Sequence, residues 1–85
     1  MKVNLTIEDF KYLTDNLLAS HPELVQNITQ DNVDINGVDI SLDETTADEI
    51  RELASEELIF HFDENYTPTK EGKILELYID KFFTG

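Results

Sequence analysis

The chain of 85 residues carries six basic and nineteen acidic side chains, a formal net charge of −13, with 40% hydrophobic residues and no cysteine. A field of this sign repels phosphate backbones and anionic lipids, so the composition argues against direct binding to nucleic acid or membranes. The lack of cysteine excludes disulfides, a thiol nucleophile and cysteine-ligated zinc. We expect one domain over residues 1–85, because a chain of this length supports a single core. No apolar run approaches a membrane span and residues 1–4 lack a signal core, which predicts a cytoplasmic protein.

The N-terminal part predicts a short strand and two helices. Apolar residues alternate over residues 3–7, which indicates a strand. Thr6 is a candidate N-cap for a helix beginning near Ile7. Pro22 ends that helix, because the residue before a proline avoids helical geometry, and it starts a short second helix. The apolar side chains expected to face the core are Ile7, Phe10, Leu13 (or Tyr12), Leu17 and Leu18 in the first helix and Leu24, Val25 and Ile28 in the second.

A β-hairpin is predicted from Val33 to Ile40. Apolar and polar residues alternate about Asn36-Gly37, the preferred pair for a type I′ turn. Folding there pairs Ile35 with Val38 and Val33 with Ile40 on one face. On the other face, Asp34 lies opposite Asp39, an arrangement that favours a cation or a basic side chain nearby.

The same segment resembles the first half of an EF-hand calcium loop, with oxygen-bearing side chains at alternate positions before a glycine. These residues are Asn32, Asp34 and Asn36, followed by Gly37. An EF-hand then requires an apolar residue and a glutamate where this chain has Asp39 and Asp43. The hairpin explains the pattern without an ion. We therefore expect no metal ligands and no cofactor, and leave open whether Asp34 and Asp39 hold a cation.

Residues 45–62 predict a long amphipathic helix with an acidic outer face. Thr46 and Glu49 have the spacing of a capping box. Apolar side chains recur at intervals of three and four, namely Ala47, Ile50, Leu53, Ala54, Leu58 and Phe62. Outward positions carry five carboxylates, Asp48, Glu49, Glu52, Glu56 and Glu57, offset only by Arg51. Like charges at this spacing repel, so they do not strengthen the helix. We interpret the five carboxylates as a candidate binding surface for a basic partner.

Residues 63–69 indicate a loop, and a last helix is expected from Thr67-Pro68 or Thr69 to Gly85. Two adjacent apolar residues cannot both face inward on one helix. In each of the pairs 59–60 and 82–83, one residue is therefore expected to contact another chain or another helix. The candidate contacts in a homodimer are Phe60, Phe82 and Phe83. The order helix, helix, strand, strand, helix, helix predicts an α+β fold of helices on a short hairpin, to which the N-terminal segment can add a third strand.

Two stretches resemble acyl carrier proteins: Thr6-Ile7-Glu8 at the start of a helix, and residues 37–43 ahead of an acidic helix. That family is all-helical and carries phosphopantetheine on the serine of an Asp-Ser-Leu triplet. The resemblance implies Ser41 as the attachment point. Ile40 separates Asp39 from Ser41, however, so the triplet is interrupted. A carrier modified at Ser41 is one alternative function.

A second resemblance covers residues 62–66 and 71–76, Phe-Asp-Glu-Asn-Tyr and Glu-Gly-Lys-Ile-Leu-Glu. These segments are similar to the tails of small acidic proteins encoded by phages and mobile elements of Gram-positive bacteria. The resemblance implies anti-CRISPR proteins and other DNA mimics as candidate functions. His21 and His61 stand apart and no catalytic constellation is evident, so no enzyme is expected. The leading hypothesis is an acidic interaction module that inhibits a basic, nucleic-acid-binding host protein; a structural homo-oligomer without ligand is the other alternative.

Overall fold

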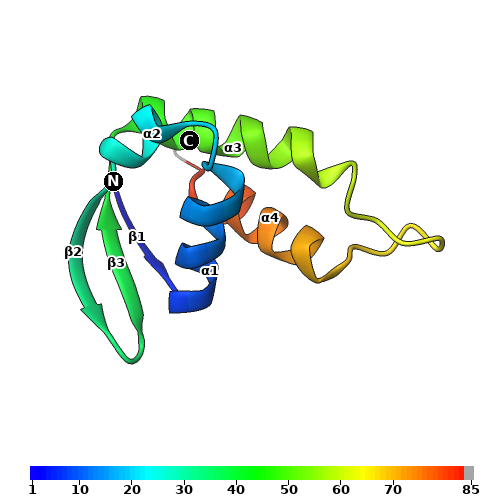
Figure 1. Cartoon of the computed structure of the whole chain (residues 1–85), viewed down its shortest axis with the longest axis horizontal. Helices are drawn as coiled ribbons and strands as arrows, with labels where there is room; N and C mark the ends of the chain where they lie inside the picture. The colour runs from blue at the N-terminus through cyan, green and yellow to red at the C-terminus, as the bar shows by residue number, and fades with distance from the viewer. Residues whose placement is uncertain (84–85) are drawn as a thin grey trace. The chain divides into compact units, whose positions relative to one another are not determined.

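The computed structural model describes residues 1–83 and confirms an α+β fold (Figure 1). Its elements are β1 (Lys2–Leu5), α1 (Ile7–Tyr12), the π-helical turn η1 (Leu13–Leu17), α2 (Pro22–Gln26), β2 (Thr29–Asp34), β3 (Gly37–Ser41), α3 (Glu44–Leu58) and α4 (Lys70–Lys81). The chain divides into two compact units, Met1–Thr46 and Ala47–Gly85. No helix within residues 1–83 is long and apolar enough to cross a membrane.

The first unit contains an antiparallel sheet in the order β1-β3-β2. The expected N-terminal strand is therefore present, and it pairs Val3 with Ile40 and Leu5 with Val38. These four side chains are buried, whereas their neighbours along β1 are exposed. Successive residues of a strand point to opposite faces, so the sheet has one apolar face and one polar face.

The hairpin is present, but its turn lies one residue earlier than predicted, so the residues of β2 next to the turn pair two residues away from their predicted partners on β3. The turn consists of Ile35 and Asn36, and the pairs are Val33 with Val38 and Asp34 with Gly37. Asp34 and Asp39 are therefore not opposed, because Asn32 takes the position opposite Asp39. Ile35 is 94% exposed at the tip.

One local and one long-range interaction explain this register. The Asp34 carboxylate accepts a hydrogen bond from the Asn36 backbone N–H at 2.7 Å, which closes the turn with a side chain. Gly37 has a φ of +144°, and a β-carbon there would lie 2.4 Å from the Leu5 carbonyl oxygen. Glycine is needed where β3 passes β1, not inside the turn. Asn36 has a negative φ, which excludes the predicted type I′ turn.

The first helix begins as expected, since the Thr6 hydroxyl accepts a hydrogen bond from the Asp9 backbone N–H at 3.1 Å. It then widens into η1, which places Leu13 and Leu17 in the core. Ile7 is 45% exposed, so its predicted place in the buried stripe is wrong. Proline starts α2 as predicted, and Ile28 lies beyond the end of that helix.

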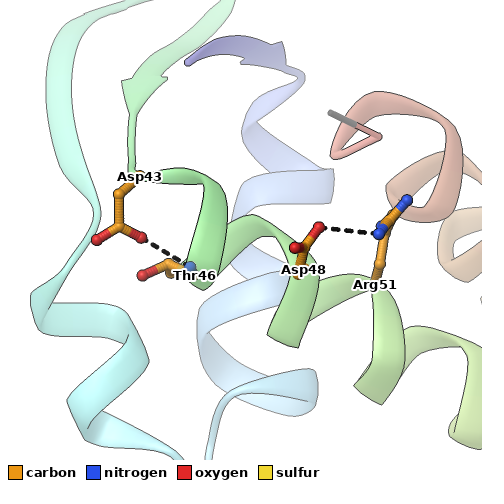
Figure 2. Close-up of polar contacts among 4 residues, drawn as sticks. All are labelled: Asp43, Thr46, Asp48 and Arg51. Atoms are coloured by element: carbon orange, nitrogen blue, oxygen red, sulfur yellow. Dashed lines mark hydrogen bonds and ion pairs between the residues drawn. The ribbon is translucent and has the colours of Figure 1, made fainter. Parts of the chain in front are cut away.

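The start and end of α3 both differ from the prediction. Asp43 caps the helix by accepting a hydrogen bond from the Thr46 backbone N–H at 2.7 Å (Figure 2). The predicted capping box of Thr46 and Glu49 is therefore wrong, because Thr46 lies inside the first turn with its side chain buried. The helix ends at Leu58, four residues before the predicted end at Phe62.

The chain turns back after α3 because Phe62 forms an isolated β-bridge with Pro68. The Thr69 backbone N–H also donates to the His61 carbonyl at 2.8 Å. Residues 63–69 lie outside the helices, as predicted, and the Asp63 carboxylate accepts the backbone N–H groups of Asn65 and Thr67. These bonds give the loop its own structure.

Thr69 is the N-cap of α4, since its hydroxyl accepts a hydrogen bond from the Gly72 backbone N–H at 3.2 Å. Leu75, Tyr78 and Phe82 are buried, and the rings of Tyr78 and Phe82 meet edge to face with centroids 6.0 Å apart. The helix ends at Lys81; Gly85, where it was predicted to end, lies outside the described residues.

Candidate interaction surfaces

The five predicted partner-binding carboxylates all lie on α3. Glu49, Glu52, Glu56 and Glu57 are exposed, and Asp48 is half-buried. Asp48 accepts a hydrogen bond from Arg51, with Nη2 and Oδ1 2.8 Å apart (Figure 2). Within residues 1–83, Glu49, Glu52 and Glu56 form no ion pair, and Glu57 approaches only His61, at 3.9 Å. Most of the negative charge on α3 is therefore not neutralised by the rest of the described chain.

Helix geometry places four of the five carboxylates on one side of α3 and the fifth on another side. Asp48, Glu52 and Glu56 follow one another at a rise of about 6 Å and a rotation of about 40°, so they form one row. Glu49 projects close to the direction of Glu56. Glu57 lies nine residues after Asp48 and is rotated from it by about 180°, which places it on another side of the helix. The predicted surface is thus the row with Glu49, and Glu57 is separate.

A hollow of about 360 Å³ lies beside the row, between α3 and α4. Its lining residues are Arg51, Glu52, Ser55 and Glu56 of α3 and Ile79 of α4. We call it the α3–α4 hollow. It joins two carboxylates to an apolar side chain, and its lining cation, Arg51, is already hydrogen-bonded to Asp48. Such a site suits a lysine or arginine, whose aliphatic stem contacts apolar groups while its head meets carboxylates.

Arg51 links the acidic row to an exposed aromatic residue. Its guanidinium lies 5.3 Å from the ring centroid of Phe83, which is a cation–π distance. Its Nε is buried without a hydrogen-bond partner within the described residues. The sequence held no signal for the Phe83 contact or for Ile79 in the hollow, because both depend on how α3 packs against α4.

The three predicted homodimer contacts have different environments. Phe60 is 73% exposed and Phe83 is 61% exposed, so both are available to a second chain. Phe82 is fully buried and belongs to the core of the second unit. Ile59, beside Phe60, is also 69% exposed. Exposed apolar side chains therefore occur at the end of α3 and at the end of α4.

The polar face of the sheet carries a second hollow, of about 310 Å³, which we call the sheet hollow. It is lined by Lys2, Val3 and Asn4 of β1, Asp31 of β2 and Asp39 of β3. Asp39 accepts a hydrogen bond from the Asn4 side-chain amide at 2.7 Å. No group of three or more metal-ligating side chains occurs within residues 1–83.

Ser41, the predicted attachment point of a carrier protein, lies on β3, and its hydroxyl donates to the Asp31 carboxylate. The all-helical fold that the carrier resemblance implies is not observed, because the described residues form a three-stranded sheet. His21 and His61 each lie near a glutamate, at 3.3 Å and 3.9 Å, and belong to different units.

Searches against protein-family models, curated proteins and solved structures found no match to this chain. A function is therefore inferred from the chain's own surfaces.

Proposed function

We propose that this chain is an acidic interaction module, in which Asp48, Glu52 and Glu56 of α3 bind a basic surface on another protein. The observation that carries the proposal is the position of Glu52 and Glu56. Both carboxylates border the α3–α4 hollow beside Ile79, and neither has a basic partner within residues 1–83. A basic side chain from a partner would supply the missing counter-charge.

Charge density supports a nucleic-acid-binding protein as the partner. From Asp48 to Glu56, four carboxylates and one guanidinium leave about three net negative charges over a rise of about 12 Å. This is about one charge per 4 Å, close to the spacing of about 3.4 Å along one strand of B-DNA. A protein surface that binds a phosphate backbone would therefore meet a similar linear charge on α3. This is the physical basis for proposing a DNA mimic and an inhibitor of the phage type.

The α3–α4 hollow and Phe83 would contribute affinity beyond charge. Exposed charges mainly accelerate encounter and set specificity, whereas anchors in pockets and exposed aromatic residues carry most of the binding energy. A lysine or arginine of the partner fits the α3–α4 hollow, with its stem on Ile79 and its head between Glu52 and Glu56. Phe83 is exposed near Arg51 and would lie at the rim of such a contact.

Two matched double variants test this proposal. Glu52→Lys with Glu56→Lys reverses the carboxylates at the α3–α4 hollow. Glu57→Lys with Glu64→Lys makes the same change in net charge at exposed positions outside both the row and the α3–α4 hollow. The tagged chain is first used to capture proteins from lysates of Gram-positive bacteria. Affinity for the captured protein is then measured against salt and in competition with duplex DNA.

We expect the first pair to weaken binding by about a hundredfold and the second by about tenfold or less, because charges facing each other at close range couple most strongly. Binding should fall steeply as the Debye length shrinks to about 8 Å at physiological salt, and duplex DNA should compete. Equal losses from the two pairs would show that only total charge matters. Unchanged affinity in the first pair would exclude the α3 face.

The two alternative functions have separate readouts. A phosphopantetheine mass increment abolished by Ser41→Ala would establish a carrier. A concentration-dependent dimer that dissociates in a Phe83→Asp or Phe60→Asp variant would establish a structural homo-oligomer, since both side chains are exposed. A chain that is unmodified, monomeric and bound to a DNA-competed protein supports the proposed module.

A further inference from the structure

The strand β2 is an edge strand with neither face covered. It pairs only with β3 within the described residues, and all six of its residues are exposed. In contrast, β1 alternates between exposed and buried residues, and β3 is mostly buried. In Figure 1, β2 lies on the outer side of the sheet. At β1 and β3, one face of the sheet packs against the core. At β2 the same face lies beyond the core and is exposed.

The outer edge of β2 has unused backbone groups. In an antiparallel ladder, alternate residues of an edge strand turn their N–H and C=O groups away from their partner. Among residues 1–83, the backbone hydrogen bonds formed outside the helices and the sheet include none to β2. Such a row of donors and acceptors is a template for an added strand.

The side chains of β2 show what kind of strand would fit. Asp31 and Asp34 carry negative charge on the strand nearest the open edge. Asp39 adds a third carboxylate on the polar face, on the neighbouring strand. On the other face, Val33 lies opposite the buried Val38 yet is itself 57% exposed. An added strand would thus contact carboxylates on one face and an exposed valine on the other.

We propose that the open edge of β2 binds an extended segment of another protein in which basic and apolar residues alternate. The backbone of that segment would pair with β2, its basic side chains would lie near Asp31 and Asp34, and its apolar side chains would cover Val33. Lys2, a basic residue on the polar face, lies on β1, on the other side of β3 from β2, and lines the sheet hollow together with Asp31. This surface belongs to the first unit, and the proposal does not depend on α3.

Charge favours a basic segment over a second copy of the chain. A second copy would bring the same net charge of −13 and the same two aspartates to the interface. Like charges across a strand pair destabilise it, whereas opposite charges stabilise it. The edge is also shaped by a bulge between Gln30 and Asn32, a feature that discourages indiscriminate pairing of edge strands.

The test uses the whole chain, labelled with nitrogen-15, and a peptide of alternating lysine and valine about eight residues long. We expect the peptide to shift the amide signals of residues 29–34 and to slow hydrogen exchange within them. A lysine–proline peptide with the same charge cannot complete the ladder, because proline has no N–H to donate, and should bind at least about tenfold more weakly.

A pair of charge variants completes the test. Asp31→Asn with Asp34→Asn removes two charges but keeps side-chain oxygens that can accept from Ser41 and from the Asn36 backbone. It should weaken binding of the lysine–valine peptide about three- to tenfold. Glu8→Gln with Asp15→Asn removes the same charge from exposed positions elsewhere in the first unit and should weaken it less than about twofold.

Three results would overturn the proposal. Equal binding of the lysine–proline peptide would show that charge alone is recognised. Shifts confined to residues 48–57 would assign the peptide to α3, a result that would leave the proposed function intact. A dimer of the free chain in which residues 29–34 become protected with rising concentration would assign the edge to a second copy.

Discussion

Two adjacent phenylalanines at the end of α4 give the sharpest test of the packing, because their environments are opposite. Phe82 is fully buried with its ring 6.0 Å from that of Tyr78, whereas Phe83 is 61% exposed above the Arg51 guanidinium. Phe82→Ala should lower the free energy of unfolding by about 3–5 kcal/mol, because it leaves a cavity and removes the edge-to-face contact. Phe83→Ala should cost only about 0.5–1 kcal/mol, the value of an exposed cation–π contact.

The assay is urea denaturation followed by circular dichroism, with both variants measured in the same buffer. A loss of about 4 kcal/mol is a large share of the 5–15 kcal/mol typical of a folded domain, so Phe82→Ala should unfold at a much lower urea concentration than the parent chain. Phe83→Ala should keep most of the parent's midpoint. Equal losses in the two variants would refute the assignment of Phe82 to the core and Phe83 to the surface.

The burial of Phe82 also changes how a homodimer should be tested. An aspartate at this position would place a charge inside the core, so Phe82→Asp is expected to unfold the chain whatever its oligomeric state. Phe60→Asp and Phe83→Asp change exposed side chains and leave the core intact. Sedimentation of these two variants is therefore the informative comparison.

Two further predictions concern single residues of the scaffold. Hydrogen bonds from the side chain and backbone of Thr46 lower the pKa of Asp43 below its ordinary value of 3.8. A group whose pKa is lower in the folded state than in the unfolded state stabilises the fold when it is ionised, so this contribution should be lost as the pH falls below about 3.8. Asn still caps a helix but does not titrate, so Asp43→Asn should reduce the pH dependence of stability measured in urea titrations. Gly72→Ala should lower the thermal midpoint, because its β-carbon would lie 2.6 Å from the His61 carbonyl oxygen. A midpoint raised by the substitution, as helix propensity alone predicts, would show that this close approach does not exist.

Several features of the molecule could be predicted from local sequence because they depend on local physics. The N-caps at Thr6 and Thr69 follow from hydroxyl side chains placed just before a helical pattern. Proline at position 22 starts α2, since its fixed φ suits the first turn of a helix. The α+β class and the acidic surface of α3 follow from periodicity and composition.

Most of the errors occur where a distant part of the chain decides a local feature. The hairpin register depends on Gly37, which the neighbouring β1 backbone requires to be glycine. The apolar pattern continues to Phe62, but α3 ends at Leu58 because Phe62 pairs with Pro68. The N-cap of α3 is Asp43 and not Thr46. Both residue types are suited to an N-cap, so the sequence alone did not distinguish them.

The candidate sites divide in the same way. Composition by itself determined that this protein is strongly acidic, and helical periodicity determined that Asp48, Glu52 and Glu56 share one side of α3. Only the tertiary structure decided that Glu52 and Glu56 border a hollow with Ile79, that Phe82 is buried while Phe83 is exposed, and that β2 has an open edge. Periodicity describes the direction of a side chain from its own helix or strand, whereas a hollow or an open edge depends on which other elements pack there.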